Sequence, residues 1–279
     1  MKVGITGAGG YVGSHLARYL EERGHAVVRL SRSRGFRLGE PVRPEIVTGL
    51  DALIHAAYDF AARGAADIER VNVKGSIALF EAAAAAGVGR LIFISSMAAF
   101  PTCRSLYGRG KLAVETHVLR LGGDAVRPGT IYGGEAGGIF RSVSALAEKL
   151  PVIPLPGGGQ QVFYLIHIDD LSALIERLLG TDLPDGRRLL RVACPEPLTL
   201  REVITRIARG LGQRRVFLPV PAALVMTGLR VAETVLGRQC PVRSDSLLSL
   251  LNPDPAPDFS LPAALAGARF RGFETAHRQ

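Results

Sequence analysis

The sequence predicts an α/β fold, a parallel, doubly wound sheet with helices on both faces, together with a small, mostly helical lobe. Short apolar runs suited to buried strands recur through residues 1–133, with helical patterns between them. The chain opens with an apolar run, a glycine-rich turn and a helical stretch. Residues 134–279 are expected to form mainly the helical lobe and an irregular tail, while a segment at about 160–195 returns to the first domain.

The glycine-rich turn, Gly-Ala-Gly-Gly-Tyr-Val-Gly at residues 7–13, follows the apolar run Lys2–Thr6 and precedes a helical pattern through Leu16 and Leu20. The first glycine permits a tight turn, the next lets the backbone approach a pyrophosphate, and the third lets helix and strand pack closely, while helix amides attract phosphates. The spacing is G-x-x-G-x-x-G rather than G-x-G-x-x-G, and a purely structural turn is the alternative. We interpret the turn as a cofactor-binding site made of Gly7, Gly9, Gly10, Tyr11, Val12 and Gly13.

The second predicted strand, Ala26–Leu30, ends at Ser31 and Arg32, where an NAD site would carry an acidic residue for the ribose hydroxyls. A hydroxyl and a guanidinium suit a 2′-phosphate instead. The sequence therefore favours NADP as the cofactor and leaves NAD possible. The alternative is that the arginines of this loop are merely solvated.

The connection to the next predicted strand, Ala52–Ala56, is too short for a helix and a strand of ordinary length. We expect the usual crossover helix to be missing and Phe36–Gly39 to form a short edge strand. Ala66–Ala86 is predicted to be one helix, and Asn72 is expected to brace it rather than to contact a ligand.

Residues 91–115 contain an apolar strand followed by the candidate catalytic residues Ser96, Tyr107 and Lys111. On a helix that begins near Tyr107, the i, i+4 spacing places Tyr107 and Lys111 on one face. A nearby ammonium lowers the pKa of a phenol, ordinarily ~10, toward the range useful for general acid–base catalysis. Ser96 could hydrogen-bond the same substrate oxygen. Because Y-x-x-x-K is a common pattern, a half-exposed tyrosine beside a solvated lysine is the alternative.

These groups belong to a series of motifs that occur in a fixed order along residues 7–170. They are Gly7, Gly10 and Gly13; Asp51–Ala57; Asn72–Ser76; Ser95 and Ser96; Tyr107 with Lys111; Arg127–Gly133; and His167–Asp170. In this order they resemble the extended short-chain dehydrogenase/reductase family, of the epimerase/dehydratase type that often acts on nucleotide sugars. The resemblance implies a Rossmann-type fold, a C-terminal lobe that binds substrate, and a Ser96–Tyr107–Lys111 triad in which Tyr107 and Lys111 also contact the cofactor.

The resemblance also places other residues beside the cofactor. In the family, the segment that corresponds to His55, Ala56 and Ala57 passes along the cofactor. We therefore interpret His55 as a residue that lines the wall of the site, with a purely structural role as the alternative. Pro128, which follows the predicted strand Ala125–Arg127, is taken as a further cofactor contact.

Two departures from the family pattern bear on the reaction. Met97 and Ala98 stand where family dehydratases place acidic residues, and elimination of water needs an additional acid and base. We therefore expect no 4,6-dehydratase activity, with Glu135 as the nearest carboxylate that a distant loop could supply. Phe163 stands where the family ordinarily carries an arginine for the phosphates of the sugar nucleotide, a charge that Arg141 or the C-terminal helices could replace.

The pattern of the second half of the chain predicts a helix over 138–150 and one strand over Val162–Ile166. It also predicts a helix over Leu171–Leu179, whose N-terminus is capped by Asp169 or Asp170. Later helices are predicted from a capping box at Thr199–Glu202 to Leu211, at Ala222–Leu236 and at Ser244–Leu251.

Composition fits a cytosolic enzyme, since we expect no signal peptide and find no apolar run long enough to cross a bilayer. Cys103, Cys194 and Cys240 are odd in number and widely spaced, which indicates neither a disulfide framework nor a zinc site. The net charge of +9 could attract nucleic acid, membranes or anionic substrates. Only four of the 34 basic residues are lysines, however, and an arginine excess of this kind can reflect genomic bias.

We therefore expect a cytoplasmic, NADP-preferring oxidoreductase that transfers hydride to or from a carbonyl or alcohol of a sugar or nucleotide sugar. One alternative is a nucleotide-sugar epimerase with tightly held NAD(P). Another is a non-catalytic NADP-binding scaffold, against which the intact Ser96, Tyr107 and Lys111 argue. We expect a small-molecule substrate, no metal and no nucleic-acid partner, and a homodimer stays open.

Overall fold

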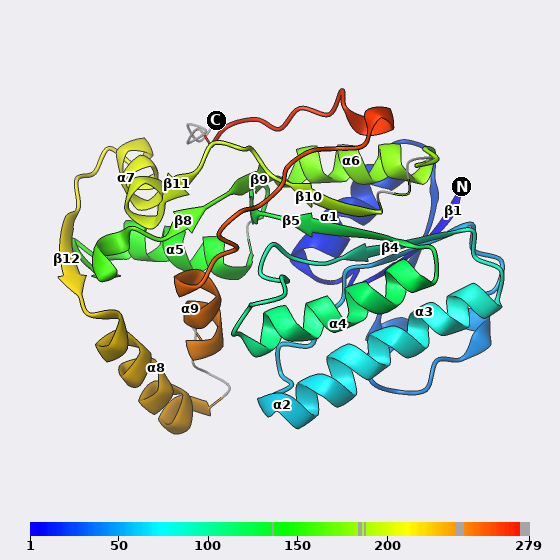
Figure 1. Cartoon of the computed structure of the whole chain (residues 1–279), viewed down its shortest axis with the longest axis horizontal. Coiled ribbons are helices and arrows are strands. Elements are labelled where there is room, and N and C mark those ends of the chain that lie inside the picture. Colours follow the sequence, from blue (N-terminus) through cyan, green and yellow to red (C-terminus); the bar gives the residue numbers. More distant parts are fainter. Residues whose placement is uncertain (136, 184–185, 187, 238–242, 274–279) are drawn as a thin grey trace.

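A six-stranded parallel sheet forms the centre of the computed structural model, which describes residues 1–135, 137–183, 186, 188–237 and 243–273. The strands follow the spatial order β10-β5-β4-β3-β1-β2 (Figure 1). From β1 the chain moves one way to β2 and the other way to β3, so the predicted doubly wound α/β fold is confirmed. The strands are β1 (Lys2–Thr6), β2 (Ala26–Leu30), β3 (Ala52–His55), β4 (Arg90–Ile94), β5 (Asp124–Pro128) and β10 (Leu189–Val192).

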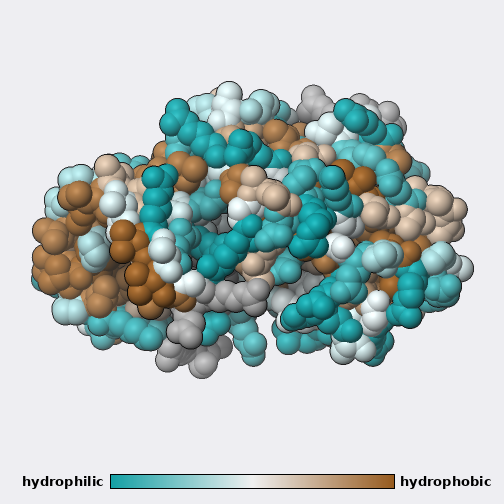
Figure 2. Space-filling model, turned by 90° about the horizontal axis from the view of Figure 1, so that it is seen from below, coloured by the Kyte–Doolittle hydropathy of each residue, from teal (hydrophilic) through white to brown (hydrophobic). Residues whose placement is uncertain are grey.

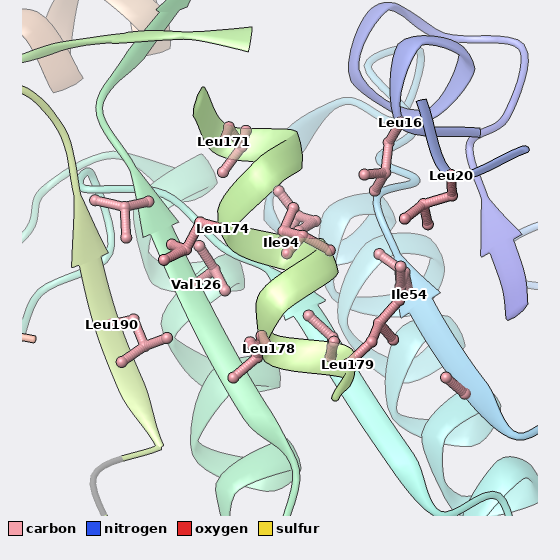
Figure 3. Packing of buried hydrophobic residues seen from close by; sticks show 14 of the residues in the cluster. Leu16, Leu20, Ile54, Ile94, Val126, Leu171, Leu174, Leu178, Leu179 and Leu190 are labelled. Carbon is pink, nitrogen blue, oxygen red and sulfur yellow. The ribbon is translucent and has the colours of Figure 1, made fainter. Parts of the chain in front are cut away.

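Two layers of helices bury the faces of this sheet (Figure 1). One face packs against α1 (Tyr11–Glu21) and α6 (Ile168–Leu179), and the other packs against α3 (Gly75–Ala85) and α4 (Leu106–Arg120). Figure 3 shows the leucines of α1 and α6 directed onto the aliphatic side chains of the strands. This packing holds the sheet and its loops in fixed positions around the cavity described below.

The segment between β2 and β3 corrects one prediction. Phe36–Gly39 forms no strand, and the segment contains only the short 3₁₀ turns Arg32–Arg34 and Pro44–Ile46. Phe36 turns into the core, and Gly39 has a φ of +86° and packs against the backbone of Val71. A chain that turns at a left-handed glycine cannot continue as a strand. Among the described strands, β2 itself therefore forms the edge of the sheet.

The predicted helix over Ala66–Ala86 is helical but not uniform. It consists of α2 (Gly64–Asp67), a π-helical segment (Ile68–Lys74) and α3. Asn72 lies in the π-helical segment, where its Oδ1 accepts a hydrogen bond from the Asp59 amide (2.7 Å) and its Nδ2 donates to the Asp59 carbonyl (3.1 Å). Asn72 therefore has a bracing role, but the segment that it braces is the loop after β3 rather than its own helix, as had been expected.

A second lobe lies at one end of the sheet (Figure 1). Three two-stranded pairs, β6 with β9, β7 with β12 and β8 with β11, surround a separate apolar core. The expected single strand Val162–Ile166 is divided between β8 and β9. The elements are β6 (Thr130–Tyr132), α5 (Gly138–Lys149), β7 (Val152–Pro156), β8 (Val162–Phe163), β9 (Leu165–His167), β11 (Leu198–Thr199), α7 (Leu200–Gly210), β12 (Val216–Val220), α8 (Ala222–Leu236) and α9 (Ser244–Leu251); short 3₁₀ turns span Gly157–Gly159 and Ala263–Leu265.

The start of α6 corrects another prediction, because its N-cap is His167 rather than Asp169 or Asp170. The Nδ1 of His167 accepts from the amide of Asp169 (3.2 Å). The two carboxylates face other elements, since Asp169 contacts His15 of α1 (2.8 Å) and Asp170 binds the backbone and guanidinium of Arg271. The capping box at Thr199 and Glu202 is present as predicted.

None of the helices in the described ranges is long and apolar enough to cross a membrane. Cys103 and Cys194 are buried, free thiols, and Cys240 lies outside the described residues.

Candidate active site

One large cavity, with a volume of about 2080 Å³, runs along the carboxyl ends of the parallel strands and into the second lobe. It is lined by the glycine turn after β1, the loops after β2, β3, β4 and β5, and parts of α4, α5, β8 and α9. Small-molecule pockets commonly measure ~300–1,000 Å³. The cavity therefore has room for a cofactor and a second ligand together.

The glycine turn lines one end of this cavity, and each of its glycines has different surroundings. Gly7 has a φ of +68°, and a Cβ there would lie 2.9 Å from the Cα of Ala57. A Cβ on Gly13 would overlap the carbonyl of Gly7, whereas the space beside Gly9 is open. Gly10 is the N-cap of α1. A backbone surface without side chains at a helix N-terminus fits the pyrophosphate of a dinucleotide.

Tyr11 and Val12 also line the cavity, as predicted for the turn. Tyr11 donates its hydroxyl to the carbonyl of Gly133 (2.7 Å), which ties the turn to the loop after β6. Burial, and then the charge of Asp169, raise the pKa of Tyr11. This tyrosine therefore remains a neutral structural donor.

Arginines surround the cavity where β2 ends. Ser31 and Arg32 line it as predicted, with Ser31 Oγ 2.9 Å from Ser33 Oγ and Arg32 exposed. The Nε of Arg63 is buried and has no hydrogen-bond partner among the described groups. Sequence reasoning missed Arg63, because its position after β3 gives no local sign of where the side chain lies. The arginines that line this end are Arg29, Arg32, Arg34, Arg37 and Arg63.

His55 does not occupy its predicted place. Ala56 and Ala57 line the cavity, but His55 lies beneath them with no exposed surface and is not part of the lining. Its Nδ1 is 2.6 Å from Thr6 Oγ1 and its Nε2 is 2.7 Å from Ser76 Oγ. Burial, and then the charge of Lys111, lower the pKa of His55 to about 3. His55 is therefore a neutral core residue rather than a wall of the site.

Ser96, Tyr107 and Lys111 come together in the middle of the cavity, and Pro128 at the end of β5 lines it beside them. Tyr107 lies in the first turn of α4, and its side chain hydrogen-bonds Ser96. The neighbouring Ser95 is buried and donates to Glu115 Oε2 (2.9 Å). The choice of Ser96 over Ser95 therefore agrees with the position of each side chain.

Lys111 is turned more deeply into the protein than the sequence suggested. Only 5% of it is exposed, and its Nζ donates to the carbonyl of Ile94 (2.8 Å) and lies 5.9 Å from the ring centroid of Tyr107. Burial lowers the pKa of Lys111 to about 7, opposed by the charge of Glu115. Lys111 can therefore hold or release a proton near neutral pH.

The electrostatics of Tyr107 correct the expectation of a lowered pKa. Burial raises the pKa of Tyr107, and its hydrogen bond with Ser96 lowers it by less. The reason is the burial of the phenol itself, which disfavours its charged form. A raised pKa favours the protonated phenol, the form that a general acid requires.

A buried ion pair supports α4, the helix that carries Tyr107 and Lys111. Arg127 of β5 donates its Nε to Glu115 Oε2 (2.8 Å), and a second donor bonds Oε1. Glu115 lies four residues after Lys111 on α4, so the bidentate pair holds the face of the helix that carries the lysine.

Tyr58 and Phe60 were not singled out from the sequence. The ring of Tyr58 packs edge-on against Tyr107 with centroids 4.9 Å apart, and Phe60 stacks near both. The two side chains lie in the loop that Asn72 braces. The aromatic spacing gave no sign of this contact, because it depends on the path of that loop.

Asp245 of α9 was also missed. Its carboxylate accepts hydrogen bonds from the amides of Leu106 (2.8 Å) and Tyr107 (3.0 Å), at the start of α4. Ser105 accepts from Gly108 at the same helix end (3.0 Å). The second lobe thus contacts the catalytic helix at the residue that carries the phenol.

The substrate end of the cavity is formed by the second lobe. Phe163 is buried and lines it, so the position that the family resemblance assigned to an arginine is apolar. Arg141 and Arg243 line it as well. Glu135 is exposed and does not belong to the lining. Within the described ranges, no cluster of His, Cys, Asp and Glu could hold a metal ion.

Residues 3–189 match the NAD dependent epimerase/dehydratase family. The chain belongs to this family. Its neighbours in sequence include the ceramide reductase of Caulobacter vibrioides, which is 33% identical over 261 residues, or 81% of this chain and 76% of that protein. The 2-alkyl-3-oxoalkanoate reductase of Stenotrophomonas maltophilia is 29% identical over 259 residues, 77% of each chain.

The fold of the family is also found in solved structures. MoeE5 in complex with UDP-glucose and NAD superposes with a TM-score of 0.69 at 22% sequence identity, covering 90% of this chain and 97% of that one. The similarity extends over both the parallel sheet and much of the second lobe, and it agrees with the resemblance drawn from the motifs.

Proposed function

We propose that the protein is an NADP-preferring oxidoreductase that transfers hydride between the cofactor and a carbonyl or alcohol. The observation that carries this proposal is the meeting of Ser96, Tyr107 and Lys111 in one cavity with the glycine turn. The names of the two reductase relatives support reduction as the working direction. A non-catalytic scaffold would not need a buried lysine with a pKa of about 7 beside a protonated phenol.

The chain's own residues supply positioning and the proton. A bound nicotinamide supplies the hydride. Tyr107 donates its phenolic proton to the carbonyl oxygen as that oxygen becomes an alcohol, and Ser96 orients the same oxygen. Lys111 holds a proton near the site and, by the family resemblance, binds the ribose of the cofactor.

NADP preference follows from the charges where β2 ends. Ser31 and Arg32 lie in the lining, and no described acidic side chain lines the cavity beside them. A 2′-phosphate would meet guanidinium groups there, whereas the ribose hydroxyls of NAD would lack a carboxylate partner.

A nucleotide-sugar epimerase is the second candidate. Arg141 and Arg243 both line the substrate end and could contact a diphosphate. Dehydration of a nucleotide sugar is not part of the proposal, because Met97 and Ala98 line the cavity after Ser96 and cannot move protons. The appearance of a 4-keto-6-deoxy product from UDP- or dTDP-glucose would contradict this exclusion.

The decisive experiment replaces the proposed acid. Tyr107→Phe should retain the fold and bind NADPH while turnover of carbonyl substrates falls by the ~10²–10⁴ typical of a lost general acid. Tyr19→Phe, on α1 and outside the cavity lining, is the matched control and should leave turnover unchanged. NADPH fluorescence reports binding and consumption. Unchanged turnover in Tyr107→Phe would favour a binding protein without catalysis.

A further inference from the structure

The substrate end of the cavity has one largely apolar wall and one polar wall. The largely apolar wall comes from α5 and the adjoining β8. Its apolar residues are Phe140, Ala145, Leu146, Leu150, Val162 and Phe163, and α5 also contributes Arg141, Ser142 and Lys149 to the lining. The polar wall is the start of α9 with Ser244, Asp245, Ser246 and Ser249. A ligand that satisfies both walls must have an apolar part and a polar part.

We infer that the substrate is an amphipathic ketone with an extended hydrocarbon chain, which lies along the α5–β8 wall while its carbonyl end lies near Tyr107. This inference rests on the proposed oxidoreductase function. It goes further by assigning a hydrocarbon chain, rather than a sugar diphosphate, to the apolar residues of the lobe.

The buried phenylalanines carry the first step of the argument. Phe163 is 4% exposed and Phe140 is 9% exposed, and both belong to the apolar core of the lobe while also lining the cavity. The two rings offer a diphosphate no charged partner, so packing against them would cost its hydration, and its charged contacts would have to come from Arg141 and Lys149 of the same helix. A hydrocarbon chain on the same wall loses no hydrogen bonds and buries apolar surface.

The wall also continues to the outside of the molecule. Leu150 and Val162 line the cavity and are each 36% exposed. Val152, the first residue of β7 and two residues after Leu150, is 47% exposed. Figure 2 shows apolar residues gathered at the end of the molecule that carries β12 and α8, next to this strand pair. A chain longer than the cavity can therefore leave it over apolar surface rather than meet a closed end.

Ser249 gives the polar part of the ligand a partner. Its Oγ is buried, lines the cavity, and has no hydrogen-bond partner among the described residues. Buried hydroxyls in native proteins are normally satisfied. A hydroxyl, ester or amide group of the substrate near its carbonyl would supply the missing bond.

The test is a series of methyl 3-oxoalkanoates of increasing chain length, assayed with the full chain and NADPH. We expect kcat/KM to rise by about threefold per methylene until the α5–β8 wall is covered, because each methylene leaves water. Leu146→Gln should reduce this gain for the long ketones. Leu121→Gln, on the outside of α4, is the matched control and should not alter the series.

Binding to the Tyr107→Phe protein with NADPH, measured by calorimetry on the same series, separates the two proposals. Affinity that rises with chain length supports the inference. If turnover is absent at the same time, only the proposed oxidoreductase function fails. Affinity and kcat/KM that stay flat with chain length would overturn the inference. So would tight binding of UDP-glucose that weakens in Arg141→Ala, and in that case Tyr107-dependent turnover would still support the oxidoreductase.

Discussion

Arg32 is the residue on which the proposed NADP preference depends most directly. It is exposed, it lines the cavity just after β2, and it belongs to a group of arginines contributed by separate loops. Its neighbours Arg29 and Arg37 are paired with Glu21 and Glu40. Arg32 is therefore the better placed guanidinium for a 2′-phosphate.

Arg32→Asp should weaken NADPH binding by about tenfold or more and leave NADH binding nearly unchanged, because a carboxylate would face the 2′-phosphate. Fluorescence titration of each cofactor measures both effects. Arg230→Asp on α8 makes the same charge change away from the cavity and should alter neither affinity. Equal loss of both cofactors in Arg32→Asp would remove the basis for NADP preference.

The proposed catalytic residues show what local sequence can and cannot predict. The i, i+4 spacing correctly placed Tyr107 and Lys111 on one helix and in one cavity. It could not predict that Lys111 is buried and bonded to the carbonyl of Ile94, because burial is decided by the elements packed above a helix. The direction of the Tyr107 pKa shift was therefore wrong, although the residue itself lies where expected.

At the scale of elements, α9 is the part of the second lobe that reaches the catalytic helix. Asp245 accepts both amides at the start of α4, and the preceding Ser244 is held by the carboxylate of Glu233 from α8 (2.6 Å from Ser244 Oγ). A carboxylate at a helix N-terminus satisfies free amides and favours the positive end of the helix dipole. The position of Tyr107 thus depends on the lobe as well as on its own helix.

Asp245→Asn should lower stability by ~1 kcal/mol, because one of the two oxygens that accept from the amides of α4 becomes an NH2 group that cannot accept, and should lower kcat by about tenfold through misplacement of Tyr107. The Kd of NADPH should stay constant, since the glycine turn is untouched. Stopped-flow rates and thermal melts measure the two effects.

Two further variants test that interpretation of Asp245. Formate should partly restore kcat in Asp245→Gly, because it can occupy the carboxylate position. Asp67→Asn removes an exposed carboxylate that pairs with Arg70 and should change neither property. A fall in melting temperature with no change in kcat would mean that Asp245 serves stability alone.

The elements themselves were largely predictable, because apolar runs and glycine turns report local burial. The strands of the sheet, the capping box at Thr199 and the helices of the lobe lie close to their predicted positions. The misplaced elements depend on distant contacts. Phe36–Gly39 turns because Gly39 packs on Val71, and α6 begins at His167 because both aspartates bind other elements.

At the scale of the whole molecule, His55 links stability to pH. It lies within the core between β1 and the helix layer, and burial lowers its pKa from 6.5 to about 3. Between these values the unfolded chain binds a proton that the folded chain does not. Stability from this group is therefore complete above pH 6.5 and is lost as the pH falls toward 3.

We expect the free energy of unfolding to fall by up to about 1.4 kcal/mol per pH unit from His55 alone below pH 6.5. His55→Asn should be less stable at pH 7, because its bonds to Thr6 and Ser76 are disturbed, but should show a shallower slope. Urea unfolding over a pH series measures both. His117→Asn, on the outer part of α4, should keep the wild-type slope. An unchanged slope in His55→Asn would assign acid sensitivity to the carboxylates instead.

The position of β2 at the rim of the sheet matters before folding is complete. Its outer backbone groups have no partner strand among the described residues, and such a row can pair with another copy of the chain during synthesis. The strand is short and carries Arg29, whose guanidinium is held by Glu21 of α1. Charge on an edge strand opposes stacking of two chains, so we expect Arg29 to limit aggregation of newly made protein in addition to lining the cavity.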